Sequence, residues 1–373
     1  MKKTAGFIAV IIGLVLFSFS VHCASESDEI KNEIEKGFFD SLDSEVFDLL
    51  EDFGIDSLDA DSIFSGTSES IKIYFSKNLK EKLSDASGWF FMGVCIIMLL
   101  SVASGAFDFS SSGDAFLLFS AAVVCVITVG KISTFLNCVL SAIALNGKLM
   151  LSFIPVFALV VSLSGNPTAA LTYNSFMLFF CEAVNFFAEN FFVGVVGACF
   201  SLSIGFAFNP AINLGRFING VNRAASLVLG FCATAFTGVL SLKNVLAVST
   251  DALSVKGVKF LLSSLVPVIG SSLSEAYSSV LGSINLMRSS LAVIGIFALV
   301  ILNIPAMTEG VVYFFLMTVL SCLAEILGLF RVSEVFRSFA ACIRILLLTG
   351  FFQVFVLIIS IGIMLALRGG VSG

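Results

Sequence analysis

Apolar residues fall into long runs separated by short polar stretches from residue 89 to the end of the chain. Runs of about 20 apolar residues are typical of helices that cross a lipid bilayer. The plausible spans are 89–107, 115–130, 149–165, 175–190, 191–208, 224–240, 289–304, 310–330 and 345–367. Because residues 132–147 are apolar enough to be a further span or a re-entrant piece, the pattern predicts roughly seven to ten spans.

The first 24 residues have the pattern of a secretory leader. Met1-Lys2-Lys3 precede an apolar run from Ala5 to Val21. Residues that are small or that a signal peptidase tolerates follow around Cys23. This order of basic, apolar and small residues is typical of a signal peptide. Cleavage, retention as an anchor helix and lipidation at Cys23 are all open, but each places residues 25–87 outside the cytoplasm.

Residues 25–87 show a different pattern, in which apolar positions recur at helical spacing between acidic residues. The pattern predicts two amphipathic helices joined by a connector rich in Asp and Ser at 54–67. The two apolar series are Ile30, Ile34, Phe38, Leu42, Val46, Leu50 and Phe53, then Ile71, Phe75, Leu79 and Leu83. We expect these stripes to meet each other or another protein, in a helical hairpin with a solvated face or in a partner site.

Composition excludes a soluble globular enzyme. Of the 373 residues, 58% are hydrophobic and 12% are charged, whereas soluble domains contain about 25% charged residues. Residues 24–88 contain 17 acidic residues and six lysines, while the rest of the chain contains nine acidic and 14 basic residues. The predicted fold is therefore all-α: a polytopic integral membrane helix bundle over 88–370, preceded by a signal peptide and a small exported helical segment.

Motifs for catalysis and energy coupling are missing from the sequence. The single histidine, His22, lies in the leader, and no two cysteines have the C-x-x-C spacing, so zinc sites and His-based catalysis are not expected. The Gly130-Lys131 and Gly147-Lys148 pairs lack the other residues of a nucleotide-binding P-loop. We expect no enzymatic activity, no cofactor, no metal and no nucleic-acid partner.

Ionisable residues at membrane depth are the candidate functional residues, because a charge inside a bilayer is expensive. One polar stripe at helical spacing consists of Glu182, Asn185 and Glu189. Glu325 and Arg344 are an expected pair, since one short connector at 331–337 separates their predicted helices. These residues fit either structural pairing inside a bundle or a water-lined path or ion site.

Residues 260–288 form the most unusual stretch, with eight serines and a single acidic residue, Glu275. Pro267 cannot donate to a helix ladder and Gly270 tolerates any backbone conformation, so a break is expected near 266–270. Broken helices occur at membrane depth where they are buried in protein or line a cavity. The stretch is therefore either an interfacial serine-rich helix or a cavity-lining broken or re-entrant segment.

Basic residues give the expected orientation through the positive-inside rule. If 132–147 crosses the membrane, Lys243, Lys256, Lys259, Arg288, Arg331 and Arg337 face the cytoplasm. If it does not cross, the same residues face outward. The rule therefore favours a crossing by 132–147.

The serine-rich region also resembles a known family. The resemblance rests on Asp251-Ala-Leu-Ser-Val-Lys256-Gly-Val-Lys259-Phe, Leu265-Val-Pro267-Val-Ile-Gly270, Ser274-Glu275 and Ser289-Ser290-Leu-Ala-Val-Ile-Gly295. These segments are similar to the signature core of the stage III sporulation protein AE family, and the layout of leader, acidic segment and membrane region is similar too. The chain departs from the family at Met287-Arg288-Ser289, where Lys-Asn is usual.

The resemblance implies a non-enzymatic membrane component of the secretion-like channel complex between mother cell and forespore during endospore formation. It implies a place in the mother-cell membrane around the forespore, beside other stage III sporulation operon proteins that include a cytoplasmic ATPase. A forespore membrane protein is an implied partner across the intermembrane space. The conduit is expected near Pro267, Gly270 and Glu275.

Two other functions fit the same residues. A stand-alone secondary transporter would bind its substrate near Glu182, Glu189 or Glu325. A structural assembly factor would anchor partner rings in the membrane.

Overall fold

The computed structural model describes residues 31–55, 60–106, 113–187, 193–208, 220–221, 223–243 and 270–366. Every regular element within these residues is helical. The elements are residues 31–41, α2 (Ser44–Asp52), α3 (Ala60–Ala106), α4 (Gly113–Leu163), α5 (Pro167–Phe186), α6 (Val193–Phe208), the helix Arg223–Lys243, α8 (Gly270–Ile326) and α9 (Phe330–Ala366). The expected leader at 1–24 lies outside the described residues.

Five of the described helices are long and apolar enough to cross a membrane. They contain the segments Glu69–Gly105, Leu118–Leu163, Arg223–Lys243, Leu281–Ile326 and Phe330–Leu365. This confirms the prediction of an all-α, multi-pass membrane bundle.

Several predicted spans are joined into single helices. α4 contains the predicted span 115–130, the segment 132–147 and most of 149–165, and α8 contains 289–304 and most of 310–330. Pro155 and Pro305 lie inside these two helices without ending them. The 57 residues of α8 measure roughly 85 Å at about 1.5 Å per residue, which is far longer than the hydrocarbon core of a bilayer at about 30 Å.

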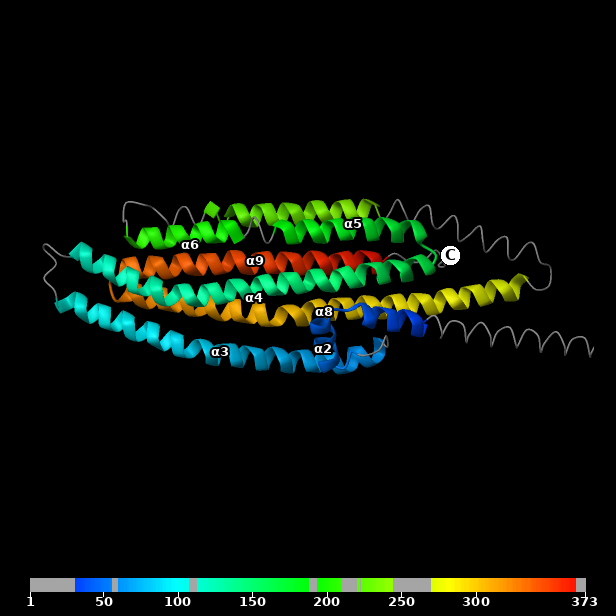
Figure 1. The fold of residues 1–373 in the computed structure, drawn as a ribbon, viewed down its shortest axis with the longest axis horizontal. Coiled ribbons are helices and arrows are strands. Elements are labelled where there is room, and N and C mark those ends of the chain that lie inside the picture. Colours follow the sequence, from blue (N-terminus) through cyan, green and yellow to red (C-terminus); the bar gives the residue numbers. More distant parts are fainter. Residues whose placement is uncertain are drawn as a thin grey trace, which may run out of the picture.

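α8 and α9 form the antiparallel hairpin at the centre of the bundle. Gly328 makes the turn with φ +77°, and the Leu329 N–H donates to the carbonyl of Ala324 at 2.9 Å. α4 packs on both helices, α3 packs mainly on α8, α5 packs on α4, and α6 packs on α9. In Figure 1, α2 and α3 follow one side of the elongated bundle, α5 and α6 follow the other side, and α4, α8 and α9 lie between them.

Residues 31–55 pack back onto the long apolar helices of their own chain, an arrangement that the sequence pattern did not predict. Phe38, Val46 and Leu50 are buried in one cluster with Phe153 of α4, and the rings of Phe38 and Phe153 meet edge to face with centroids 6.3 Å apart. The apolar series of the first amphipathic helix is therefore occupied by α4 and α8.

The second predicted apolar stripe is only partly buried. α3 turns Ile71 and Tyr74 towards the cluster formed with α8, whereas Phe75, Leu79 and Leu83 stay exposed. Helical spacing predicts an amphipathic helix here. The position of α8 determines which of its apolar side chains are buried and which stay exposed.

Candidate functional site

Lys82 and Glu309 form an ion pair between α3 and α8. The Lys82 Nζ lies 2.7 Å from the Glu309 Oε2, and the side chains are 28% and 8% exposed. A carboxylate this deeply buried is costly unless a charged partner and hydrogen bonds compensate it. The pair therefore fixes where α3 lies along α8, one to two turns from the edge-to-face contact of Trp89 with Tyr313.

Three buried amides form a second polar cluster, where α4, α8 and α9 meet. The Nδ2 of Asn146 donates to the Oδ1 of Asn303 at 3.1 Å and to the Oε1 of Gln353 at 3.2 Å. Asn303 returns a bond to the Oδ1 of Asn146 at 2.8 Å, and Gln353 donates to the carbonyl of Ile143 at 3.3 Å. Because each amide has a partner on another helix, the cluster holds three helices in a single register.

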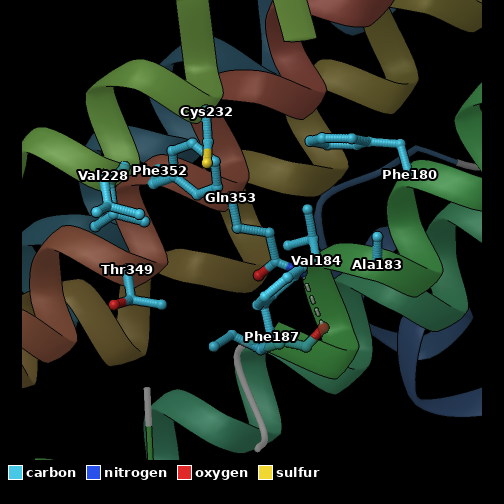
Figure 2. A pocket seen from close by; sticks show the side chains of 11 residues that line it. Phe180, Ala183, Val184, Phe187, Val228, Cys232, Thr349, Phe352 and Gln353 are labelled. Atoms are coloured by element: carbon cyan, nitrogen blue, oxygen red, sulfur yellow. Dashed lines mark hydrogen bonds between the residues drawn. The ribbon is translucent and has the colours of Figure 1, made fainter. Parts of the chain in front are cut away.

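A cavity of about 240 Å³ lies beside this amide cluster. Figure 2 shows side chains of α5, of the helix Arg223–Lys243 and of α9 around it, with the Gln353 side chain extending from α9 toward Val184. Val228 and Phe187 are exposed, whereas Ile143, Leu229 and Gln353 are buried. The cavity therefore runs from the outer surface inward to Gln353, and its walls are almost entirely apolar.

Asp43 both caps the start of α2 and forms an ion pair that holds residues 31–55 on α4. Its Oδ1 accepts a hydrogen bond from the N–H of Glu45 at the start of α2, and its Oδ2 lies 3.0 Å from the Nζ of Lys148 on α4. The hydrogen bonds from Lys148 and from the Glu45 N–H lower the pKa of Asp43 below its usual value. One turn along α4, the Ser152 hydroxyl donates to the carbonyl of Ser41 at 2.6 Å.

Arg288 is buried on α8 without a hydrogen-bonding partner for two of its nitrogens. Its side chain is 2% exposed, and among the described residues none accepts a bond from its Nε or Nη2. Arg288 lies where the sequence departs from the family pattern, and the local sequence does not indicate that its side chain is buried.

The predicted pair of Glu325 and Arg344 is wrong. Glu325 instead accepts a bond from the Nη2 of Arg337 at 2.8 Å, and both side chains are exposed. Arg344 lies over the ring of Phe314, 5.4 Å from its centroid. The reason is that residues 331–337 are the first turns of α9 and not a connector, so Arg337 comes opposite Glu325 first.

The other predicted site residues are exposed or lie outside the described part of the chain. Glu182 is exposed on α5. Gly270 begins α8, and the described part of the serine-rich stretch continues as helix into the next apolar segment. The structure does not describe Glu189, Pro267, Asp251, Lys256, Lys259 or the side chains of Asn185 and Glu275.

The two sides of the bundle differ in polarity. On the side of α2 and α3, acidic and basic side chains are exposed at Asp40, Asp48, Glu51, Asp52, Lys72, Lys77, Lys80, Glu81 and Asp85. On the opposite side, α5, α6 and the helix Arg223–Lys243 contain three charged residues, Glu182, Arg223 and Lys243, and expose large apolar side chains such as Leu171, Phe179, Leu227 and Phe231. The second side is suited to lipid. The charged residues of the first side require water or a polar partner, whereas the second half of α3 exposes apolar side chains such as Phe91, Leu99 and Val102.

Comparison with known proteins identifies the family. The family model described as stage III sporulation protein AE matches residues 48–368. The chain belongs to the stage III sporulation protein AE family. The matched range takes in α3, α4, α8 and α9, and with them both polar clusters.

One curated protein of this family is similar to the chain at low sequence identity. The chain is similar to a protein of Bacillus subtilis (strain 168) named stage III sporulation protein AE, with 21% identity over 245 residues. The match covers 65% of this chain and 61% of that relative, so this chain spans less than two thirds of the relative's length. No solved structure matches the chain.

Proposed function

We propose that this protein is a non-enzymatic membrane component of a channel complex that acts between mother cell and forespore during endospore formation. Its polar side, formed by residues 31–55 and the first half of α3, faces an aqueous lumen. Its apolar side, formed by α5, α6 and the helix Arg223–Lys243, faces lipid. Family membership supports the role in sporulation.

The observation that supports a channel role is the difference in polarity between these sides. Charged side chains beside membrane-spanning helices normally face water or a polar partner, because lipid cannot solvate them. Lys72, Lys77 and Lys80 are exposed on α3, with no ion pair among the described residues. A lone transporter would be expected to enclose such groups within one chain, whereas a subunit that shares a lumen with its partners leaves them on its surface.

A charge reversal on the polar side tests this proposal. In a strain that lacks the native gene, Lys77→Glu combined with Lys80→Glu is expected to lower the number of heat-resistant spores strongly while the protein stays in the membrane. The matched control is Lys243→Glu, an exposed lysine on the opposite side, which is expected to sporulate normally. Normal sporulation by the double variant would contradict a lumen-facing role.

Co-purification separates the candidate functions. A channel subunit or an assembly factor is expected to co-purify in mild detergent with other stage III sporulation operon proteins, among them the cytoplasmic ATPase. If the wild-type protein alone moves a solute across liposome membranes, it is a secondary transporter and the proposal is wrong. If the double variant loses its partners as well as sporulation, the assembly role replaces the channel role.

A further inference from the structure

We propose that the cavity between α5, the helix Arg223–Lys243 and α9 binds an acyl chain of a membrane phospholipid. This inference concerns the apolar side of the bundle and does not depend on the proposed channel function. It rests on the chemistry of the cavity walls, on the depth of the cavity and on its size.

The walls of the cavity exclude polar occupants. Phe180 and Val184 of α5, and Phe187 directly after this helix, face Val228 of the neighbouring helix and Phe352 of α9 across the space (Figure 2). A bound water needs two to four polar partners, and the polar groups of the floor are already engaged, since the Gln353 amide bonds to α4 at both ends. An apolar occupant is therefore the one that these walls stabilise.

The depth of the cavity matches the region of acyl chains. The helix Arg223–Lys243 has 21 residues, its two charged ends included, and is about 32 Å long, close to the hydrocarbon thickness of about 30 Å. Val228 and Cys232 follow Arg223 by five and nine residues, so they lie about 8 and 14 Å from that end along the axis. At these depths lipid tails, and not headgroups, surround the protein.

The size of the cavity selects a single chain. A volume of about 240 Å³ cannot admit a helix, which is about 10–12 Å wide with its side chains. A flexible hydrocarbon chain fits, and it can enter past Val228 and Phe187 because these side chains are exposed at the mouth. The phospholipid chain provides the van der Waals contacts that the side chains lining an empty cavity would lack.

An acyl chain in the cavity would also contact the amide cluster. Gln353 forms part of the floor and accepts a hydrogen bond from Asn146. Thr349, one turn earlier on α9, lines the same cavity. The lipid chain would therefore contact α9 beside its contacts with α4, because Ile143 of α4 lines the same cavity.

Photo-crosslinking in vesicles tests the proposal. The full-length protein is reconstituted with phosphatidylethanolamine, phosphatidylglycerol and a phosphatidylethanolamine whose palmitoyl chain ends in a diazirine. After irradiation, mass spectrometry is expected to find adducts on residues 349–353 as well as on 180–187 and 228–232. Adducts confined to outward-facing positions such as Leu171 and Leu227, with none on residues 349–353, would overturn the proposal.

Two neighbouring tryptophan variants provide the matched comparison. Val228→Trp fills the mouth and is expected to reduce the label on 349–353 at least about tenfold, equivalent to about 1.4 kcal/mol of binding. Leu227→Trp adds the same side chain at a position that is 67% exposed and does not line the cavity, so the label is expected to persist. Equal labelling of residues 349–353 in the two variants would overturn the proposal.

A second cavity-filling variant keeps the proposal testable if the first variant misfolds. If Val228→Trp does not purify as a single species, Ala183→Met narrows the cavity from α5 with a smaller change in volume. It is expected to reduce the label on 349–353 while the label on exposed Leu171 stays unchanged. An unchanged ratio of the two labels would contradict the proposal.

Discussion

The Nζ of Lys82 and the Oε2 of Glu309 lie 2.7 Å apart although the two residues are 227 positions apart in the sequence. Lys82 lies on the charged half of α3, and Glu309 lies one turn after Pro305 in the apolar α8. The pair thus joins the polar side of the bundle to its central hairpin.

Replacing Lys82 with Met is expected to destabilise the protein by about 2–3 kcal/mol, because Glu309 would remain buried without a partner. This is somewhat less than the 3–5 kcal/mol typical of fully buried pairs, since Lys82 is partly exposed. The double variant Lys82→Met with Glu309→Leu is expected to recover most of the loss. Thermal unfolding in detergent, arranged as a double-mutant cycle, measures both effects.

The pair of Glu325 and Arg337 is the natural control for that experiment. It also joins two helices at 2.8 Å, but both partners are exposed, so Arg337→Met is expected to cost less than about 1 kcal/mol. Equal losses in Lys82→Met and Arg337→Met would show that burial of Glu309 does not matter.

Replacing Asn303 with Leu is expected to cost about 1–3 kcal/mol, because the Oδ1 of Asn146 would lose its donor in a buried site. Asn137→Leu, at an exposed position on the same helix as Asn146, is expected to change stability by no more than about 0.5 kcal/mol. Thermal melts of the two variants in the same detergent provide the comparison. A neutral Asn303→Leu would rule out the amide cluster as a source of stability.

Acidification is expected to weaken the docking of residues 31–55 on α4. The pKa of Asp43 is lowered in the folded state by Lys148 and by the Glu45 N–H. Ionised Asp43 therefore stabilises the docking of residues 31–55 above the ordinary carboxyl pKa of about 3.9. The contribution is lost as the pH falls through the lowered pKa. Hydrogen exchange of residues 31–55, corrected for the intrinsic rate at each pH, is expected to rise below about pH 4.

Asp43→Asn is expected to remove this pH dependence and to raise exchange at neutral pH. Asp48→Asn, at an exposed position of α2, serves as the control and is expected to keep the wild-type profile. The same profile in the Asp43 and Asp48 variants would mean that another group controls docking.

Adding a methyl group at Gly310 is expected to destabilise the bundle. A Cβ at this position would lie 2.5 Å from the Cδ2 of Leu347 and 2.5 Å from the Cζ of Phe135, and overpacking of this kind costs about 1–3 kcal/mol. Gly282→Ala on the same helix meets nothing within 4 Å and is expected to be neutral or to stabilise α8 by up to about 1 kcal/mol. Melting temperatures that shift in the same direction would refute the close approach of α4, α8 and α9.

The sequence predicts the class of fold because apolar runs have one physical solution in a bilayer, but it does not predict how many helices contain them. The predicted segments 115–130, 132–147 and 149–165 are separated at Lys131 and Lys148. In the structure Lys148 lies on the bundle surface, where Asp43 is its partner, so α4 needs no loop there.

The buried polar groups could not be predicted for a related reason. Lys82 belongs to a stretch that its charge assigns to the exported segment, and Asn146, Asn303 and Gln353 are single amides in apolar surroundings. Their significance comes from partners more than 150 positions away, which no local spacing encodes. The pairing of Glu325 was mispredicted because the start of α9 at Phe330 was placed too late.

The alternating course of the long helices has a practical consequence for labelling studies. α3 and α8 run one way along the bundle, α4 and α9 run back, and the start of α3 and the end of α9 lie toward the same end (Figure 1). A fluorescent or enzymatic tag fused after Ala366 is therefore expected to lie toward the end of the bundle where α3 begins, so that one fusion reports on the position of both helix ends.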